Sequence, residues 1–311
     1  MASASKESIK CIVPPALRPG DKVAMVSPAY RTPLQNVTGA AEVLRGWGFE
    51  PVLGEHVGRM DAGRYAGTDA ERLEDLRRAL HDPTIRAILC NRGGYGTFHF
   101  VEALTAEVFT ADPKWLIGFS DITTLLSMEA CAGVMAIHGP MDSTLAASRG
   151  QSESCQKLHD LLVGKVPRYE LPANPLNRPG KASGTLVGGN LSTLIPLLDS
   201  WADVTRRNGF ILFVEEIEES MHHIDRMLNM LLLRGLMERC RGIILGDFTG
   251  CAGEFTYASV EEMIVRILPE SGIPVLCGFP AGHGGVNLPL VMGAPATLEV
   301  RPDGSCLQFD L

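Results

Sequence analysis

The sequence predicts an α/β protein with two domains: a doubly wound parallel-sheet domain, followed by a smaller domain of mixed α and β structure. Three observations predict this. Short apolar runs alternate with helical patterns through the first half of the chain, which is typical of a parallel sheet covered by helices on both faces. A proline-rich stretch then interrupts the pattern. Beyond it, further strand and helix signals follow in a less regular order.

In the first half, each expected strand leads toward a helix. We expect strands at 22–27, 51–53, 85–90, 115–119 and 134–138, and helices at 37–47, 68–81 and 122–130. Gly48 closes the first helix, and Asp69 and Glu71 place negative charge in the first turn of the second, where it is stabilising. This order indicates a flavodoxin-like, amidotransferase-like sheet, whose functional groups gather at the carboxyl ends of its strands.

The domain boundary is expected where prolines accumulate, at positions 167, 172, 175 and 179. We therefore predict a first domain at 1–166, a linker at 167–182 and a second domain at 183–311. The second domain should contain a helix from 191, an amphipathic helix at 224–236 and strands at 209–214, 242–245, 273–276, 290–292 and 296–300. The order of its strands does not follow from the sequence.

Composition excludes several classes of function. The 311 residues carry a formal net charge of -8, which argues against a nucleic-acid partner. No apolar run is long enough to span a bilayer and no export signal is visible, so we expect a cytoplasmic protein without a membrane partner. The eight cysteines are scattered and lack paired spacing, which favours reduced, structural thiols. We expect neither a metal nor a cofactor, and His222 and His223, being adjacent, would point apart on a helix.

Ser120 is the first candidate for chemistry. It follows an apolar strand and precedes a helix, so a sharp turn there would lift its hydroxyl above the sheet, with the next backbone N–H groups facing a developing oxyanion. The alternative is a serine that caps the helix.

Two further candidates lie in the second half. Glu215 ends the apolar strand at 211–214, where an orienting carboxylate would belong, although a solvated acidic loop is the alternative. His283 stands in a glycine-rich loop and could act as a general base or be an ordinary surface histidine. Arg92 and the Gly-Gly-Tyr-Gly turn after it could bind an oxyanion or carboxylate; a phosphate is disfavoured because no Walker lysine is present.

Seven short segments, taken in order, resemble a known family, the murein LD-carboxypeptidases and microcin C immunity peptidases, which are serine peptidases. The segments are Arg92-Gly-Gly-Tyr-Gly, Ile117-Gly-Phe-Ser-Asp-Ile-Thr, His138-Gly-Pro, Leu186-Val-Gly-Gly-Asn-Leu, Leu212-Phe-Val-Glu-Glu, Ile224-Asp-Arg-Met-Leu, and Gly282-His with Asn287 downstream.

The resemblance implies a catalytic triad of Ser120, Glu215 and His283 in a cleft between the two domains. The oxyanion donors would be the backbone amides of Asp121 and of Gly93 or Gly94. We expect Arg92 and Asn190 to bind the terminal carboxylate of the substrate. Glu216 replaces the aspartate that the family has beside its first acid, so either glutamate could orient His283.

The implied partner is a small peptide, a murein tetrapeptide that loses its terminal D-alanine in peptidoglycan recycling, and the implied assembly is a homodimer. The 95 residues from Ser120 to Glu215 leave little room for the extra sequence of the immunity peptidases, which act on peptidyl-nucleotides. Those substrates remain an alternative, as does a catalytically silent muropeptide-binding protein. A glutamine-amidotransferase-like domain would require a cysteine where Ser120 stands.

Overall fold

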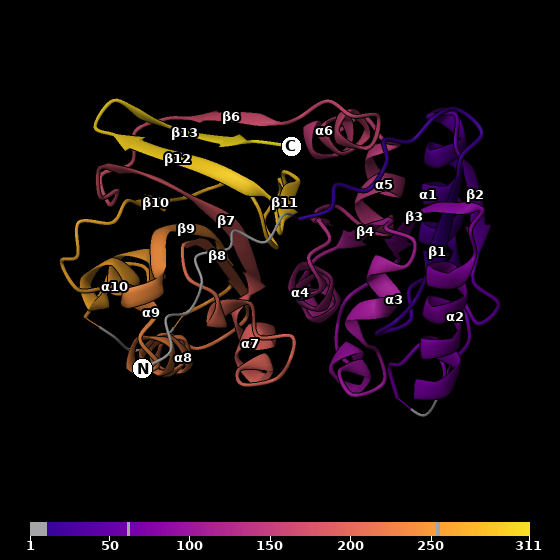
Figure 1. Cartoon of the computed structure of the whole chain (residues 1–311), viewed down its shortest axis with the longest axis horizontal. Helices are drawn as coiled ribbons and strands as arrows, with labels where there is room; N and C mark the ends of the chain where they lie inside the picture. The colour runs from indigo at the N-terminus through magenta and orange to yellow at the C-terminus, as the bar shows by residue number, and fades with distance from the viewer. Residues whose placement is uncertain (1–10, 61–62, 253–255) are drawn as a thin grey trace.

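The computed structural model describes residues 11–60, 63–252 and 256–311, and within these residues two sheets stand side by side (Figure 1). The first sheet has the order β11-β5-β4-β3-β1-β2. Its parallel strands are β1 (Lys22–Val26), β2 (Glu50–Leu53), β3 (Ile85–Cys90), β4 (Trp115–Gly118) and β5 (Ala136–His138). The carboxyl ends of these strands meet at one edge, where the candidate residues of the first half lie.

The helices of the first half follow its strands along the chain. They are α1 (Leu34–Gly46), α2 (Asp69–His81), α3 (Ala106–Thr110), α4 (Thr123–Ala132), α5 (Asp142–Ser148) and α6 (Glu153–Leu162). Helix α2 begins with a reciprocal cap, in which Thr68 and Glu71 each accept a hydrogen bond from the other's backbone. Helix α4 lies between the two halves and is buried from Thr123 to Ala130, so its apolar residues are not confined to one face (Figure 1).

The second sheet, in the described part of the chain, has the order β10-β9-β8-β7-β12-β13-β6. Four strands are parallel, namely β7 (Gly180–Asn190), β8 (Phe210–Ile217), β9 (Cys240–Thr249) and β10 (Val275–Cys277). Antiparallel pairing adds β12 (Pro295–Arg301), β13 (Gly304–Phe309) and β6 (Arg168–Leu171). The helices of this half are α7 (Leu191–Leu194), α8 (Met221–Leu233), α9 (Leu236–Arg239) and α10 (Val260–Ile267).

Two short strands lie in sheets where the sequence did not predict them. Strand β6 lies inside the stretch 167–182 that we expected to be a linker, at the free edge beside β13. Pro167 and Pro172 flank it, and an edge strand tolerates prolines because it lacks a partner on one side. Strand β11 (Leu290–Met292), expected in the second domain, pairs antiparallel with β5 of the first sheet.

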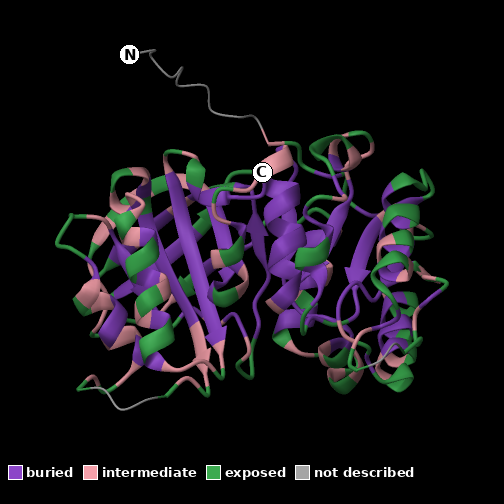
Figure 2. Cartoon of the chain, turned by 90° about the horizontal axis from the view of Figure 1, so that it is seen from below, coloured by how far each residue is buried: buried purple, intermediate pink, exposed green. Residues whose placement is uncertain are grey.

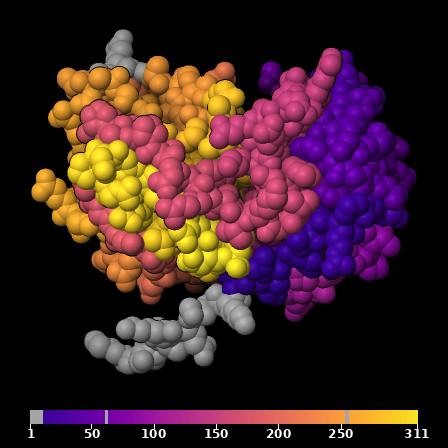
Figure 3. All heavy atoms as spheres, turned by 90° about the horizontal axis from the view of Figure 1, so that it is seen from above, coloured from indigo at the N-terminus to yellow at the C-terminus, as the bar shows by residue number. Residues whose placement is uncertain are grey.

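The buried residues form a core that continues from one sheet to the other (Figure 2). One apolar cluster includes Leu116 and Ile137 of the first sheet together with Phe213 and Leu298 of the second. A separate cluster fills the other side of the second sheet, under α7, α8 and α10. Figure 3 shows the middle of the chain, in pink, between the N-terminal half and the C-terminal strands.

The predicted fold class, a doubly wound α/β domain with a second mixed α/β domain, is confirmed, with β11 as an antiparallel addition to the first sheet. In the described ranges, no helix is both long and apolar enough to cross a membrane.

Candidate active site

Ser120 lies in a strained turn between β4 and α4. Its φ of 63° falls in the left-handed region, which few residues other than glycine adopt. Phe119 before it is extended, and a 3-10 turn at Ser120–Ile122 leads directly into α4. No side-chain hydrogen bond from Ser120 caps either helical segment in the described structure. The turn therefore presents a half-buried hydroxyl at the carboxyl end of β4, and the capping alternative lacks support.

Gly93 brings the turn after β3 against Ser120. A Cβ on Gly93 would lie 2.8 Å from Ser120 Cβ, 3.1 Å from its Oγ and 3.2 Å from the Asp121 backbone nitrogen. Only glycine permits this approach, so the backbone of Gly93 and the amide of Asp121 lie close to the serine hydroxyl. Gly94, with a φ of 114°, is packed in turn against the ring of Tyr30.

The side chain of Asp121 locks these two turns together. Its Oδ2 accepts a hydrogen bond from the Thr97 backbone at 3.0 Å, and the Thr97 hydroxyl donates to the Asp121 carbonyl at 2.7 Å. Burial raises the pKa of Asp121, while the Thr97 bonds oppose this shift. Because its carboxylate accepts hydrogen bonds, the backbone N–H is the group of Asp121 that can donate to an oxyanion.

Glu215 and His283 form the central contact of the site. Glu215 is fully buried near the carboxyl end of β8, and its Oε2 lies 2.7 Å from His283 Nδ1. Burial raises the pKa of Glu215, and the bond to His283 works against that rise. The His283 ring packs on Phe119, the residue before Ser120, with centroids 4.8 Å apart. Since Nδ1 is engaged by Glu215, Nε2 is the nitrogen left for proton transfer.

Glu216 has a different set of partners, although it is the next residue. Successive side chains of a strand point to opposite faces, and the Glu216 carboxylate turns toward the start of α7. It accepts hydrogen bonds from Asn190 Nδ2 at 2.8 Å, the Ser192 amide at 2.7 Å and the Ile217 amide at 2.9 Å. In this structure, then, Glu215 and not Glu216 contacts His283.

Asn190 supports these acids from inside the protein. It is 3% exposed, caps α7 by accepting from the Thr193 amide at 3.1 Å, and donates to Glu216. Both polar atoms of its side chain therefore have internal partners, and we treat Asn190 as a positioning residue rather than a substrate contact. Arg92 is exposed at the end of β3, and its Nη1 donates to the Arg31 carbonyl at 3.0 Å. Its guanidinium remains accessible to a carboxylate.

Asp247, which sequence reasoning missed, holds the histidine loop from both sides. Its backbone amide donates to the Ala281 carbonyl at 2.9 Å, and its Oδ2 accepts from the Gly284 amide at 3.1 Å. A Cβ on Gly284 would lie 2.4 Å from the same carboxylate, so a larger residue after His283 would displace Asp247. The available signal was an aspartate toward the carboxyl end of β9, the strand beside that of Glu215.

A buried histidine lies beneath the site. The ring of His138 packs edge-on against Phe119 and Phe213, with centroids 5.8 Å and 5.0 Å away. Burial lowers its pKa to about 3, and the nearby His283 adds to this effect. His138 is therefore neutral at physiological pH and forms part of the floor on which Phe119 and His283 rest.

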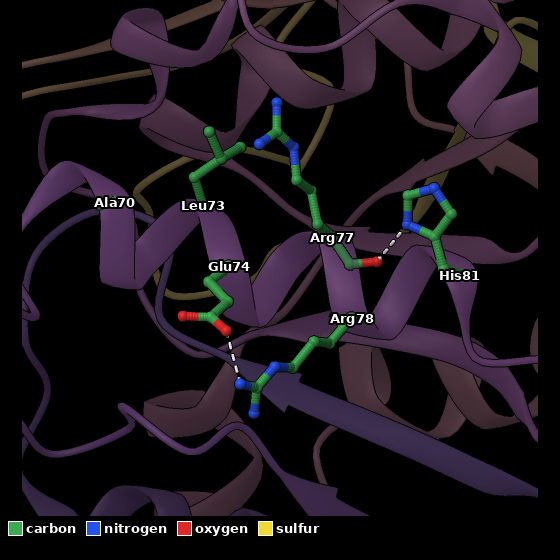
Figure 4. Close-up of a pocket in the computed structure, with 6 residues that line it drawn as sticks. All are labelled: Ala70, Leu73, Glu74, Arg77, Arg78 and His81. Atoms are coloured by element: carbon green, nitrogen blue, oxygen red, sulfur yellow. Dashed lines mark hydrogen bonds and ion pairs between the residues drawn. The ribbon is translucent and has the colours of Figure 1, made fainter.

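Neither the cysteine thiols nor a hollow on α2 adds a candidate residue to this site. All eight cysteines fall within the described residues and are free thiols. Burial raises the pKa of Cys131 to about 11 and that of Cys277 to about 12, which makes both poor nucleophiles. The described residues contain no cluster of three or more potential metal ligands among His, Cys, Asp and Glu. A hollow of about 530 Å³ lies on the outer face of α2 and contains no candidate site residue (Figure 4).

Comparison with known proteins identifies matches in both halves of the chain. The LD-carboxypeptidase N-terminal domain matches residues 23–139, and the LD-carboxypeptidase C-terminal domain matches residues 183–298. A putative carboxypeptidase of Synechocystis is 35% identical over 95% of this chain and 96% of its own length. The murein tetrapeptide carboxypeptidase of Pseudomonas aeruginosa is 33% identical, over 89% of this chain and 93% of its own.

A solved structure of a related fold contains a ligand. The microcin C7 self-immunity protein MccF, in complex with aspartyl sulfamoyl adenosine, superposes with a TM-score of 0.82 at 25% identity. The superposition covers 94% of this chain and 97% of that protein.

Proposed function

The chain belongs to the LD-carboxypeptidase family of peptidases, as its sequence predicts, and from this premise we propose that it removes the terminal D-alanine from murein tetrapeptides. Ser120 is the nucleophile, His283 the general base, and Glu215 the acid that orients His283. The observation that carries the proposal is the 2.7 Å contact of buried Glu215 with His283, whose ring rests on the residue before Ser120. The role is peptidoglycan recycling in the cytoplasm, by a homodimer.

The mechanism follows from these positions. His283 Nε2 accepts the proton of Ser120 Oγ as the oxygen attacks the carbonyl carbon that precedes D-alanine. Glu215 accepts the hydrogen bond of His283 Nδ1–H and offsets the charge of the imidazolium. His283 then donates the proton to the departing amine of D-alanine. A water molecule, deprotonated by the same nitrogen, hydrolyses the acyl-enzyme and regenerates Ser120.

Backbone amides stabilise the tetrahedral intermediate. The Asp121 N–H and an N–H of Gly93 or Gly94 donate to the oxyanion. Both turns are positioned before the reaction, since Thr97 is hydrogen-bonded to Asp121 and Gly93 packs against Ser120. Arg92 binds the carboxylate of the terminal D-alanine, because an exposed guanidinium offers two parallel donors to such a group.

The test is mass spectrometry of L-Ala-γ-D-Glu-meso-diaminopimelyl-D-Ala after incubation with wild type and with Ser120→Ala. We expect the wild type to release one alanine and the variant to leave the tetrapeptide intact. An untouched tetrapeptide in the presence of folded wild type would contradict the proposal. Labelling of Ser120 by a serine-directed phosphonate separates an enzyme from a catalytically silent binding protein, which would not react.

A second candidate function is cleavage of a peptidyl-nucleotide. It is favoured by the similarity to MccF, because this similarity extends over nearly the whole chain. A structure of MccF holds an aminoacyl sulfamoyl nucleoside. Wild type that leaves the tetrapeptide intact but hydrolyses a peptidyl-nucleotide would establish this activity in place of the first.

A further inference from the structure

The loop that carries His283 crosses from the second sheet to the first. It follows β10 of the second sheet and ends at β11, which pairs with β5 of the first sheet (Figure 1). A backbone hydrogen bond from the Leu288 amide to the Pro280 carbonyl, 2.9 Å long, closes the loop at its base. The position of His283 relative to Ser120 therefore depends on how this loop is attached to the first half.

Asn287 is a buried polar residue of this loop. It is 5% exposed, and its Oδ1 accepts a hydrogen bond from the Gly282 amide at 3.1 Å. Gly282 directly precedes His283 and is packed against Glu215, because a Cβ on Gly282 would lie 2.9 Å from Glu215 Oε2. The Gly282 peptide thus contacts both Asn287 and the proposed triad acid, one residue before the proposed general base.

Asn287 also contacts two elements of the first half. Its backbone amide donates to Ser154 Oγ in α6 at 2.9 Å, and Ser154 is itself buried. Its side-chain amide lies next to the buried ring of His138 in β5. Burial, and then the charge of His283, lower the pKa of His138, and the Asn287 side chain acts against both. One residue therefore links the histidine loop to the half that carries Ser120.

Asp247 attaches the same loop to the second sheet. It bonds the loop at Ala281 and at Gly284, on both sides of His283. Neither of these bonds involves the half of the chain that carries the nucleophile. Asn287 and the pairing of β11 attach the loop to that half, so the two anchors come from opposite sides of the site.

We propose that Asn287 is a positioning residue: by fixing the Gly282 peptide, it holds His283 at the distance from Ser120 that proton transfer requires. The inference rests on the proposed function, because it assumes that Ser120 and His283 react together. A displacement of about 1 Å between reacting groups can lower a rate about a hundredfold. A side chain that makes no contact with the substrate can therefore control the reaction through one hydrogen bond.

The test replaces Asn287 by leucine, which has the same branching but cannot accept the hydrogen bond of Gly282. We expect kcat for D-alanine release from the tetrapeptide to fall about tenfold to a hundredfold. KM should stay nearly unchanged, because the buried Asn287 does not contact the substrate. Asn287→Asp retains an acceptor oxygen, so the folded variant should recover most of kcat.

Asn287→Asp also provides a readout that does not depend on catalysis. Its carboxylate would lie next to His138 and raise the pKa of that ring, since an opposite charge favours the protonated form. The ring nitrogen chemical shifts of His138 at neutral pH should therefore move toward those of an imidazolium. Shifts identical to those of wild type would contradict the contact between Asn287 and His138 and with it the proposed anchor.

Asn177→Leu is the matched control. Asn177 is half-buried, and its Oδ1 accepts from the Cys277 amide at 2.8 Å, a bond of the same kind at β10. This variant should lose stability in urea but keep the kcat of wild type. An equal fall of kcat in the two leucine variants, or an unchanged kcat in folded Asn287→Leu, would overturn the assignment.

Ser154→Ala tests the anchor if Asn287→Leu does not fold. It removes the acceptor of the Asn287 backbone amide and leaves the loop sequence intact. Here too kcat should fall while KM stays nearly unchanged. A folded Ser154→Ala protein with the kcat of wild type would contradict attachment of the loop through Asn287.

Labelling of Ser120 by a serine-directed phosphonate separates this inference from the proposed function. Wild type that is labelled but leaves the tetrapeptide intact would contradict the proposed substrate alone. The labelling rate then replaces kcat, and it should fall in Asn287→Leu but not in Asn177→Leu. Equal rates in wild type and Asn287→Leu would overturn the inference alone. Absence of labelling in folded wild type would overturn both, since Ser120 would then lack a working base.

Discussion

The adjacent acids Glu215 and Glu216 should respond to the same substitution in opposite ways. Glu215→Gln and Glu216→Gln each remove one negative charge and change the side-chain volume little. Glu215 contacts His283, whereas Glu216 accepts its hydrogen bonds from Asn190 and backbone amides. We therefore expect the first change to impair catalysis in a stable protein, and the second to impair stability in an active one.

The structure sets the size of each effect. Glu215 is fully buried and faces the ring that becomes cationic in the transition state. Two unit charges about 4 Å apart, at an effective dielectric constant of about 20, attract by about 4 kcal/mol. Loss of that term in Glu215→Gln corresponds to a decrease in kcat/KM of about a thousandfold.

For Glu216→Gln, one carboxylate oxygen becomes an amide NH₂ that faces hydrogen-bond donors. Charge-assisted bonds contribute about 1.5–3 kcal/mol each, so we expect the free energy of unfolding to fall by about 2–4 kcal/mol. The kcat/KM of the folded fraction should stay within about tenfold of wild type, because the contact with His283 is untouched.

Two measurements on each variant decide the matter: initial rates of D-alanine release, and urea unfolding followed by circular dichroism. Glu215→Asp is a useful control, since it keeps the charge but shortens the reach. The reasoning would be refuted if Glu215→Gln retained more than about a tenth of wild-type kcat/KM, or if folded Glu216→Gln lost as much activity as Glu215→Gln.

Other predictions follow from the same contacts. Ser120→Ala should keep its fold but retain less than about one part in a hundred of wild-type turnover; greater residual activity would exclude a covalent mechanism. Asp247→Ala should lower kcat about tenfold to a hundredfold, because the loop that carries His283 loses its anchor. Asp247→Asn can still accept the hydrogen bond from the Gly284 amide, so it should restore much of kcat with an unchanged pH profile. Equal losses in the two variants would contradict a positioning role. Burial raises the pKa of Glu129 well above 4.5, so the folded protein binds this proton more tightly than the unfolded chain, and stability falls as pH rises above 4.5. Glu129→Gln should flatten that fall by up to about 1.4 kcal/mol per pH unit in urea unfolding at pH 5 to 7, and identical slopes would contradict the assignment. Activity should persist in EDTA, since no proposed step uses a metal; loss that Zn²⁺ restores would refute this.

The sequence predicted most elements of the first sheet because each is a local pattern. An apolar run such as Ile85–Cys90 can only be buried, and Thr68 with Glu71 marks a helix start without tertiary information. Partner choice is not local. Nothing in Leu290–Met292 specifies the first sheet rather than the second, and the short strand β6 was hidden between prolines.

Prediction of the site had a similar limit. Ser120 and His283 were predicted from their positions after strands and from motifs that resemble a family, and their catalytic roles stay predictions that the variants above test. The sequence left open which glutamate contacts His283. The answer depends on which face of β8 is turned toward the loop that carries His283, and this is a tertiary contact. Asn190 appears in a matched motif, yet its side chain is taken up by α7 and Glu216, a contact that no motif reveals.

The pairing of the two sheets also bears on how the proposed triad works. Ser120 comes from the first half, and Glu215 and His283 from the second, so a hinge between the halves would vary the distance between nucleophile and base. Two contacts oppose such a hinge: β11 from the C-terminal part is hydrogen-bonded to β5, and the Asn190 amide donates to Thr123 Oγ1 at the start of α4, 3.0 Å away. Because the apolar core is continuous across both sheets, separating the halves would expose buried surface. The serine and histidine therefore belong to one packed unit, and a hinge between the two halves is disfavoured.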